Sequence, residues 1–370
     1  MITKHLSAFI PSLFKNKQEQ DTLSSKKTMI EDDIYQKNNS ELPLISAEIA
    51  KLRIKRGAKI IDVRTEGEYQ EEHLPHSMLI PLSDLPEHIH LLDKKTEYLI
   101  LCAIGVRAAK ATTMLRKAGI NASCIKDGLN DWPFATVERQ ELELILFDFC
   151  PFAQRAVITL KEAGVHHKLT YLDLDKLPDW FARVSPFGKV PILRVNNETT
   201  IFESSVINEL IDNLSSKQML PSDPVELGLC RSWIEFSSTL LSQLTGMICA
   251  KNAVDFMVIH TSFIENLQRL EEQLTSHGRF FTGKDVLSLI DSSYAPLFMR
   301  MAYLNQYFDL YTKKEVPMIQ RWATDLLSSD SVVHSVPSDF SSIYYDFIQR
   351  RGENGYLLNT VLLPKLKKAA

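Results

Sequence analysis

Two cysteines occupy positions where sulfur chemistry is expected. Cys102 ends the apolar run Tyr98–Leu101, Cys150 ends the apolar run Leu144–Phe149, and a stretch with helical spacing follows each of them. The first backbone N–H groups of a helix have no partner within the helix, and the helix dipole is positive at that end. A cysteine placed there is favoured as the thiolate, which is its nucleophilic form. Both cysteines are therefore candidate catalytic residues.

Cys102 opens a six-residue stretch of the pattern Cys-x-x-Gly-x-Arg, which lies between a predicted strand and a predicted helix. Gly105 permits a tight backbone turn, so the N–H groups of the loop can point inward as an anion-binding nest. Arg107 adds a permanent positive charge. Such a loop suits a cysteine thiolate, a cysteine persulfide or an oxyanion such as sulfite. Taken alone, Cys102 also fits a small apolar residue buried at a strand end.

Cys150 is followed by Pro-Phe-Ala-Gln-Arg. Pro151 is preorganised for the first helical position and loses no needed donor there, which makes Cys150 the N-cap. We expect a lowered pKa for its thiol. Ala153 stands where a Cys-x-x-Cys motif would carry its second cysteine, so an internal disulfide is excluded. The site is expected to form a mixed disulfide with an external thiol.

The elements that position Cys102 form an α/β pattern. Strands alternate with helices between residues 42 and 134, which predicts a parallel sheet. The expected helices are 46–56, 66–72 and 107–118, and the expected strands are 59–63, 77–81, 98–102 and 122–125.

A second α/β unit begins at Leu142, after a linker at residues 136–140. Its expected strands are 142–149, 167–173, 190–195 and 200–202, its expected helices are 151–163 and 204–213, and residues 176–187 are expected to be irregular. Apolar residues then recur at helical spacing in the segments 226–245, 254–275 and 288–307. The expected segments are thus a disordered tail at 1–40, an α/β domain at 41–137, a second α/β domain at 142–216 and an all-helical domain at 225–370.

Composition narrows the class of protein. A length of 370 residues is typical of two or three domains, and a net charge of −4 gives no support for nucleic acid or an anionic membrane as partner. No apolar run is long enough to span a bilayer, and no residues cluster with metal-ligand spacing. Five cysteines without framework spacing indicate a reducing compartment, so we expect a cytoplasmic location. Three of them are expected in the core: Cys124, Cys230 and Cys249.

The segment from about residue 42 to residue 134 resembles a single-domain rhodanese, a sulfurtransferase. The residues that carry the resemblance are Ile61-Asp62-Val63-Arg64, Glu68-Tyr69, His73-Leu74-Pro75-His76-Ser77, Cys102 to Arg107, and Asp127-Gly128-Leu129 with Trp132. The resemblance implies that Cys102 is the persulfide-carrying nucleophile and that Arg107 belongs to its site. Asp62, Arg64 and His73 are interpreted as structural hydrogen-bonding residues.

This chain departs from the rhodanese pattern at three positions. Glu72 and Asp127 stand where the family usually has glycine, and Ala108 stands where it usually has serine after the loop arginine. None of these changes removes the nucleophile.

The segment from residue 142 onward resembles a glutathione transferase of the omega or dehydroascorbate-reductase type. Three motifs carry the resemblance: Cys150 to Arg155, Pro186 to Leu193, and Phe202-Glu203-Ser204-Ser205. The stretch Phe281–Asp291, in which Ser288 and Asp291 form an N-capping pair, and the following Ala295–Arg300 are typical of the helical domain of such transferases.

The transferase resemblance implies a thioredoxin-like domain that binds glutathione as a cosubstrate, and it implies a homodimer. A cis-Pro191 would leave the backbone of Val190 free to pair with the cysteinyl part of glutathione. Glu203 and Ser204 would hold the γ-glutamyl group at a helix N-terminus, and Phe152 would pack beside the tripeptide. One departure is Leu177, which stands where the family often has lysine.

The two resemblances together imply glutathione-linked sulfur transfer. A persulfide would form on Cys102, and Cys150 would carry out glutathione-dependent thiol transfer. The expected partners are glutathione and small sulfur compounds. The alternative is a non-catalytic binding or regulatory protein of the transferase fold with a rhodanese-like docking domain.

Overall fold

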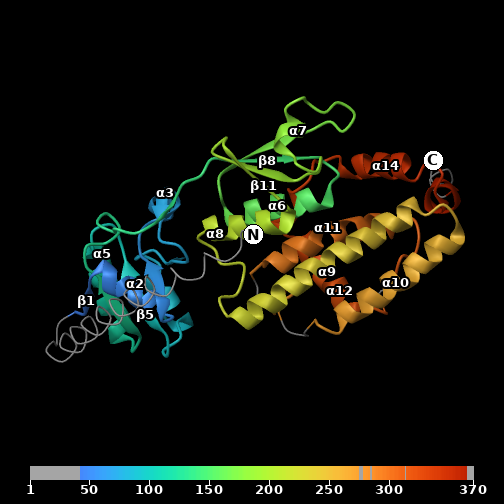
Figure 1. Cartoon of the computed structure of the whole chain (residues 1–370). Coiled ribbons are helices and arrows are strands. Elements are labelled where there is room, and N and C mark those ends of the chain that lie inside the picture. The colour runs from blue at the N-terminus through green and yellow to red at the C-terminus, as the bar shows by residue number, and fades with distance from the viewer. Residues whose placement is uncertain (1–41, 275–277, 284–285, 313, 365–370) are drawn as a thin grey trace, which may run out of the picture. The chain divides into compact units, whose positions relative to one another are not determined.

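The computed structural model of the chain describes residues 42–274, 278–283, 286–312 and 314–364. It divides into two compact units, the first ending at Glu138 and the second beginning at Arg139. Figure 1 labels the elements of both units. The division falls inside the linker expected at residues 136–140, and the tail expected at residues 1–40 lies outside the described residues.

The first unit contains a five-stranded sheet in the order β1-β6-β5-β2-β4, and every pairing in it is parallel, as expected. The strands are β1 (Leu44–Ile45), β2 (Lys59–Asp62), β4 (Met78–Leu79), β5 (Glu97–Leu101) and β6 (Asn121–Ile125). The helices are α2 (Ala47–Lys55), α3 (Glu66–Glu71), α4 (Leu85–His88), the short 3₁₀ helix Ile89–Leu91 and α5 (Val106–Lys117).

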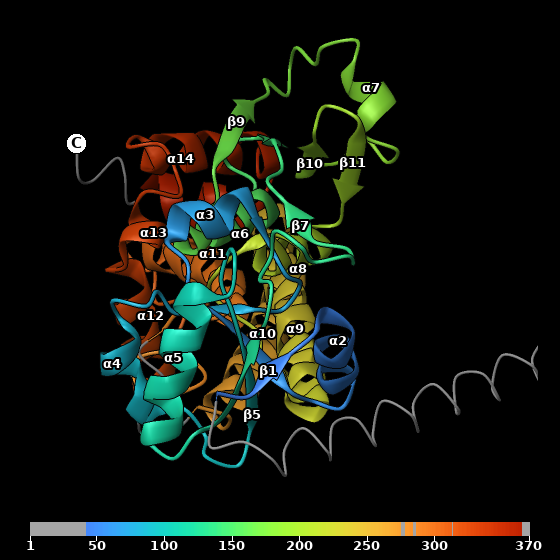
Figure 2. The same cartoon turned by 90° about the vertical axis from the view of Figure 1, so that its left-hand side faces the viewer.

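Both faces of this sheet are buried. Ile61 and Ile100 pack in a cluster with residues of α5, whereas Ile60 and Leu99 pack in a cluster with Ala50 of α2. Figure 2 shows α5 and α2 on opposite sides of β5. Strands covered on both faces are apolar throughout rather than alternating, which is why they were predictable as apolar runs. The double covering fixes the carboxyl end of β5.

Several small elements of the first unit were not predicted, namely β1, α4, the 3₁₀ helix Ile89–Leu91 and one two-stranded sheet. The two-residue strands β3 (Glu72–His73) and β7 (Val137–Glu138) form an antiparallel pair. Strands of two residues show no periodicity in the sequence, so pattern analysis does not detect them.

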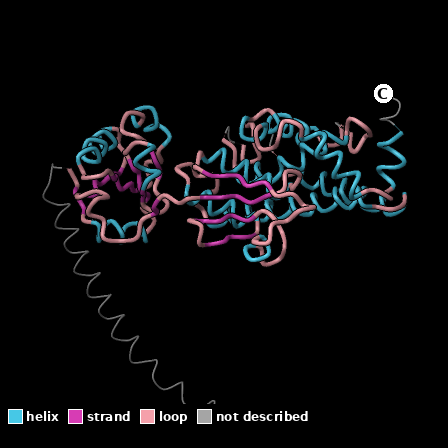
Figure 3. The backbone as a smooth tube through the Cα atoms, turned by 90° about the horizontal axis from the view of Figure 1, so that it is seen from above, coloured by secondary structure: helices cyan, strands magenta, loops and turns pink. Residues whose placement is uncertain are grey.

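The second unit begins with a four-stranded sheet in the order β11-β10-β8-β9, whose strands lie side by side in Figure 3. The strands are β8 (Leu142–Leu146), β9 (His167–Tyr171), β10 (Ile192–Val195) and β11 (Thr199–Phe202). β8 and β9 are parallel, while β10 is antiparallel to both of its neighbours. The helices of this part are α6 (Pro151–Ala163), α7 (Phe181–Val184) and α8 (Ser204–Leu214).

Several expectations for this part were wrong in detail: the strand expected at 167–173 ends at Tyr171, and the strand expected at 190–195 begins at Ile192. The strand expected at 142–149 ends at Leu146, so that Phe147 to Phe149 form the turn that leads into α6. The segment expected to be irregular at 176–187 contains the single-turn helix α7.

The rest of the second unit is helical, as expected. Its helices are α9 (Pro224–Cys249), α10 (Ala253–Glu271), α11 (Leu289–Leu304), α12 (Pro317–Leu327), α13 (Asp330–Val333), α14 (Phe340–Arg351) and the π-helical turn Leu357–Leu362. Cys249, expected in the core, is exposed because it is the last residue of α9, and Cys230 is only partly buried.

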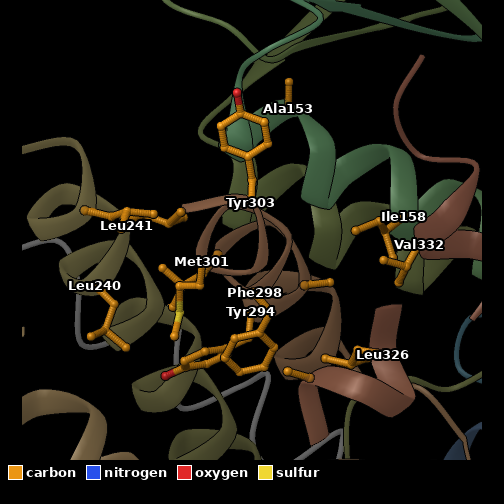
Figure 4. Close-up of a cluster of buried hydrophobic side chains, with 14 of the residues drawn as sticks. Ala153, Ile158, Leu240, Leu241, Tyr294, Phe298, Met301, Tyr303, Leu326 and Val332 are labelled. Carbon is orange, nitrogen blue, oxygen red and sulfur yellow. The ribbon is translucent and has the colours of Figure 1, made fainter. Parts of the chain in front are cut away.

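Helix α11 is the centre of the helical domain. It is buried on nearly all sides, as is typical of a helix that is apolar all round. Figure 4 shows its residues Tyr294, Phe298 and Met301 between Leu240 of α9 and Leu326 of α12. Residues of α6 belong to the same cluster, so the helix that follows Cys150 is fixed against this core.

The start of α11 confirms the N-capping pair expected at Ser288 and Asp291. Asp291 is 0% exposed and accepts hydrogen bonds from the backbone N–H groups of Ser288 at 2.8 Å and Phe281 at 3.0 Å. It also accepts from the Trp322 Nε1–H group of α12 at 2.7 Å. One buried carboxylate therefore ties the helix start to a loop and to a neighbouring helix.

We predict that Asp291→Ala lowers the free energy of unfolding by about 3 kcal/mol or more, because several buried donors lose their acceptor at once. Differential scanning calorimetry of the full chain measures the change. Asp223→Ala is the matched control, since Asp223 caps α9 in an exposed position, where loss of the cap costs about 1 kcal/mol. Equal losses in the two variants would contradict the prediction.

Candidate functional site

Cys102 lies at the junction of β5 and α5, as the sequence predicts. Its side chain is 1% exposed, and the backbone N–H of Ala108 donates a hydrogen bond to its Sγ at 3.3 Å. Gly105 has a φ of +83°, and a Cβ at this position would lie 2.0 Å from the Lys126 carbonyl oxygen. Only glycine fits there. The loop therefore curls tightly round the sulfur and directs a helix N–H group at it.

The Asp127-Gly128 turn holds this loop from outside. Leu129 N–H donates to the Cys102 carbonyl at 2.8 Å, and Asn130 N–H donates to the Ala103 carbonyl at 3.0 Å. A Cβ on Gly128, whose φ is +72°, would lie 2.4 Å from both of these carbonyl oxygens. The backbone of the motif that includes Asp127 thus holds the Cys102 loop in place. It tolerates Asp127 in place of glycine, because the close approach is made at Gly128.

A second cysteine supports the same loop. The thiol of Cys124 on β6 donates to the Gly105 carbonyl, with 3.7 Å between sulfur and oxygen. Burial raises the pKa of Cys124 to about 12, so it is a neutral thiol at physiological pH. Cys124 is therefore a core residue, as expected.

Arg107 has a different environment from the one expected. Its guanidinium forms a two-pronged ion pair with Glu68 of α3, at 2.8 Å and 2.6 Å. Glu68 also completes a capping box with Thr65. The hydrogen bond from Arg107 lowers the pKa of Glu68 to about 2. The positive charge expected beside the sulfur is thus largely neutralised by a carboxylate at the loop.

Asp62, Arg64 and His73 have the structural surroundings that were expected. Asp62 and Arg64 form a buried ion pair at 2.8 Å, and Arg64 also donates to the Glu72 carbonyl at 2.6 Å. Because Glu72 takes part through its backbone, a glutamate in place of the usual glycine keeps this contact. His73 stacks on Tyr69, with ring centroids 4.0 Å apart.

We predict that Glu68→Gln makes Cys102 more reactive toward an anionic reagent, because Arg107 then keeps an uncompensated charge. The ratio of the iodoacetate to the iodoacetamide alkylation rate, read on the Cys102 peptide by mass spectrometry, should rise about fivefold. Added salt should reduce the effect. In the wild type Glu68 stays ionised down to about pH 2; the contribution of the ion pair to stability is complete above pH 4.5 and is lost as pH falls through about 2. An unchanged ratio, or an equal rise in the control Glu66→Gln on the same helix, would refute this account.

Cys150 is the N-cap of α6, as predicted. The Val190–Pro191 peptide is cis, as the resemblance implies. The Cys150 thiol donates to the Val190 carbonyl, with 3.8 Å between sulfur and oxygen. The sulfur therefore faces the backbone that was expected to receive glutathione.

The expected direction of the Cys150 pKa was wrong. Burial raises the pKa of this thiol, and the backbone N–H groups of Ala153 and Phe152 oppose that effect only in part. The positive charges of Arg300 and Arg155 also lower it. The sequence predicted the stabilising amides but could not show how much protein surrounds the sulfur.

Glu203 and Ser204 begin α8. Glu203 has a φ of +67°, which is uncommon for a residue with a side chain and costs backbone energy. Ser204 is buried and accepts a hydrogen bond from Arg155 Nε at 2.9 Å. The Arg155 guanidinium lies over the Phe152 ring, 5.3 Å from its centroid. Arg155 thus links the residues expected on two sides of a glutathione site.

The sequence analysis assigned no role to Gln154 and Arg300, which also surround this site. Arg300 of α11 donates to the Phe149 carbonyl at 2.7 Å and to the Gln154 side-chain oxygen at 2.6 Å. These contacts join residues about 150 positions apart, so no local pattern reveals them. The only available signal was the stretch Ala295–Arg300 quoted for the transferase resemblance.

Two further properties of the described residues bear on the kind of site. They contain no group of three or more His, Cys, Asp or Glu side chains able to hold a metal ion. Within the same ranges, no helix has the length and apolar character required to cross a membrane.

The geometry defines a class of protein. A thioredoxin-like sheet carries a cysteine at the N-cap of its first helix, opposite a cis-proline, and an all-helical domain packs behind that helix. A thioredoxin-like α/β domain followed by an all-helical domain is the fold arrangement typical of the transferase that the sequence resembles. It is preceded in the chain by an α/β unit in which the loop between β5 and α5 encloses a second cysteine, Cys102.

Comparison with known proteins gives the family. The model of the glutathione S-transferase N-terminal domain matches residues 149–214, and the model of the rhodanese-like domain matches residues 46–134. Glutathione S-transferase omega-1 of Rattus norvegicus is 30% identical over 226 residues, which cover 60% of this chain and 94% of the rat protein. The chain therefore belongs to the glutathione S-transferase family, and it carries a rhodanese-like domain ahead of the transferase part.

Other relatives agree with this assignment. The probable glutathione S-transferase DHAR1, cytosolic, of Oryza sativa subsp. japonica is 30% identical over 159 residues, which cover 43% of this chain and 70% of the rice protein. Among solved structures, glutathione transferase Omega 3C from Trametes versicolor has a TM-score of 0.51 at 20% identity, and the match covers 58% of this chain and 92% of the fungal one. The structural match shows a shared fold.

Proposed function

We propose that this protein catalyses glutathione-linked sulfur transfer, with a persulfide formed on Cys102 and glutathione-dependent thiol transfer on Cys150. Membership of the glutathione S-transferase family and the rhodanese-like domain support glutathione-dependent thiol chemistry in general. The observation that carries the finer proposal is the hydrogen bond from the Ala108 N–H of α5 to the Cys102 sulfur. A helix amide aimed at sulfur stabilises a thiolate, which is the attacking group and the leaving group of Cys102 in sulfur transfer.

The reaction at Cys102 has two steps. The Cys102 thiolate attacks the outer sulfur of a persulfide such as glutathione persulfide, a sulfur–sulfur bond to Cys102 forms, and glutathione leaves as its thiolate. Sulfite then attacks the outer sulfur of the Cys102 persulfide, thiosulfate is released, and the Cys102 thiolate returns. Both steps are exchanges at divalent sulfur, so no other oxidant or reductant is required.

The reaction at Cys150 uses glutathione as thiol. The Cys150 thiolate attacks the glutathionyl sulfur of a mixed disulfide, the Cys150–glutathione disulfide forms, and the substrate leaves as a thiolate. A second glutathione thiolate attacks the glutathionyl sulfur of that disulfide, which yields glutathione disulfide and the free Cys150 thiolate. Because residue 153 is alanine, it offers no thiol that could attack the Cys150–glutathione disulfide before the second glutathione does.

The proposed glutathione site is built from backbone and short side chains. The backbone of Val190, beside the cis-Pro191, would pair with the cysteinyl residue of glutathione. Glu203 and Ser204 would hold the γ-glutamyl group, and Phe152 would pack against the tripeptide. The Ser204 oxygen accepts from Arg155, so its own O–H remains able to donate to a carboxylate.

The family also supports two proposals about state and location. We propose a homodimer, which size-exclusion chromatography with light scattering would test. We propose a cytoplasmic location as well, since all five cysteines are free in the structure, as is typical of a reducing compartment.

The proposed function predicts that Cys102→Ser abolishes thiosulfate formation from glutathione persulfide and sulfite, with a loss of at least about a hundredfold, because the sulfur-carrying nucleophile is gone. Thiosulfate is measured by ion chromatography. Cys249→Ser is the matched control, since Cys249 is an exposed cysteine at a helix end, and it should retain full activity.

The same assay with Cys150→Ser decides how the two activities are related. A lower rate of thiosulfate formation in Cys150→Ser than in the wild type would show that glutathione recognition by the transferase part assists the sulfur transfer. If the folded wild type shows no thiosulfate formation, the sulfur-transfer proposal fails. Retention on immobilised glutathione then separates a thioltransferase, which binds, from a non-catalytic binding protein, which does not.

We also predict that Ser204→Ala raises the KM for glutathione about tenfold and leaves kcat within about twofold, because the hydroxyl binds glutathione equally in the ground state and the transition state. Steady-state reduction of a glutathionylated peptide provides both constants. Ser205→Ala is the neighbouring control and should leave the KM unchanged. A large fall in kcat with an unchanged KM would place Ser204 outside the glutathione site.

A further inference from the structure

Arg300 is a buried cation held by neutral groups. It lies on α11 and is 3% exposed. Its Nη1 donates to the Gln154 side-chain oxygen at 2.6 Å and to the Pro296 carbonyl at 2.8 Å, and its Nη2 donates to the Phe149 carbonyl at 2.7 Å. The rings of Phe340 and Tyr344 lie 5.1 Å and 5.4 Å from the guanidinium carbon. These contacts fix the position of the guanidinium but do not cancel its charge.

No carboxylate of the described residues forms an ion pair with Arg300. Burial lowers the pKa of Arg300 to about 10, and the ionisable groups that act on it are Tyr344 and Cys150. Burial raises the pKa of Tyr344 far above its usual value, so this phenol is neutral at physiological pH. The thiol of Cys150 is then the ionisable group that remains as a source of negative charge.

Arg155 provides an internal comparison. It is also buried and also acts on Cys150, but two carboxylates act on it in turn, those of Glu235 and Glu203. Its charge is therefore partly compensated in the resting protein. A buried charge without a partner is costly in free energy. Of these two arginines of the described residues, Arg300 is the one on which no carboxylate acts.

We propose that Arg300 is the counter-ion of the Cys150 thiolate, a positioning residue that acts through the Phe149 carbonyl and the Gln154 side chain. This inference rests on the proposed role of Cys150 as the thiol nucleophile. The guanidinium is held to the residue directly before Cys150 and to a residue one helical turn after it. Ionisation of the thiol then supplies the negative charge that the buried arginine lacks.

The same interaction acts at two points of the catalytic cycle. It stabilises the thiolate that attacks the mixed disulfide, and it stabilises the thiolate that leaves when the second glutathione attacks. The Cys150–glutathione disulfide is neutral at its sulfur atoms and leaves Arg300 without a counter-ion. Arg300 thus raises the fraction of Cys150 present as attacking thiolate in the first step and makes Cys150 a better leaving group in the second.

The test compares the thiolate fraction of Cys150 in the full-length wild type, R300Q and R300K. Iodoacetamide is the probe, and the alkylation rate of the Cys150 peptide is followed by mass spectrometry from pH 5 to pH 10. R300Q should raise the apparent pKa of Cys150 by about one unit or more, and so slow alkylation at neutral pH about tenfold. R300K keeps the charge and should stay within about half a unit of the wild type. R231Q is the control, because Arg231 is an exposed arginine paired with Glu209.

The outcomes separate the possible roles. An apparent pKa in R300Q equal to that of the wild type would overturn the proposal, even if the melting temperature falls, because a purely structural arginine would change stability alone. If R300Q does not fold, R300K decides: a shift of about one unit or more despite the retained charge would overturn it. An unreactive Cys150 in the wild type would instead refute the proposed function itself.

Discussion

The N–H groups in the first turn of α5 and of α6 have no acceptor within their own helices, and the chemistry of this protein depends on that deficit. In the first unit the Ala108 N–H donates its hydrogen bond to the Cys102 sulfur instead. In the second unit the amides of Phe152 and Ala153 act on Cys150. The same backbone feature was thus used twice, on two unrelated sheets. The helix N–H groups reach the sulfur only if the strand before the cysteine ends at a fixed place. Each cysteine follows a strand buried on both faces, and that burial fixes the end of the strand.

The two sulfur atoms differ in how the surrounding protein controls their charge. At Cys102 the nearby cation is shared with Glu68 on the surface of the unit, so the loop amides remain as the specific stabilising groups. At Cys150 the residue is partly buried, and burial works against ionisation of its thiol. Burial strengthens the electrostatic interaction of the thiol with each nearby charge, because little water is left to screen it. A single buried arginine can then influence a nucleophile through the backbone of the turn that holds it.

The local parts of both sites were predictable from the sequence, and the long-range parts were not. The strand–cysteine–helix order, the Ser288–Asp291 cap and the cis-Pro191 follow from short motifs. The Arg107–Glu68 pair joins residues 39 positions apart, and the contacts of Arg300 span about 150 positions. Such contacts depend on how helices pack, which periodicity does not encode. The wrong direction for the Cys150 pKa has the same origin, since burial is a property of the whole domain.

Ala153 of α6 is 0% exposed and belongs to the same buried cluster as Tyr303 of α11, both of which Figure 4 labels. The helix is therefore closely packed at the position where a dithiol site would keep its second sulfur. A thiol that forms only a mixed disulfide consumes one glutathione disulfide and releases one glutathione. Its oxidised fraction therefore depends on the ratio of glutathione disulfide to glutathione. A dithiol site consumes two glutathione molecules per disulfide reduced, and its oxidised fraction changes when the whole pool is diluted. A monothiol site of this kind is consequently indifferent to the size of the glutathione pool and responds to its degree of oxidation alone.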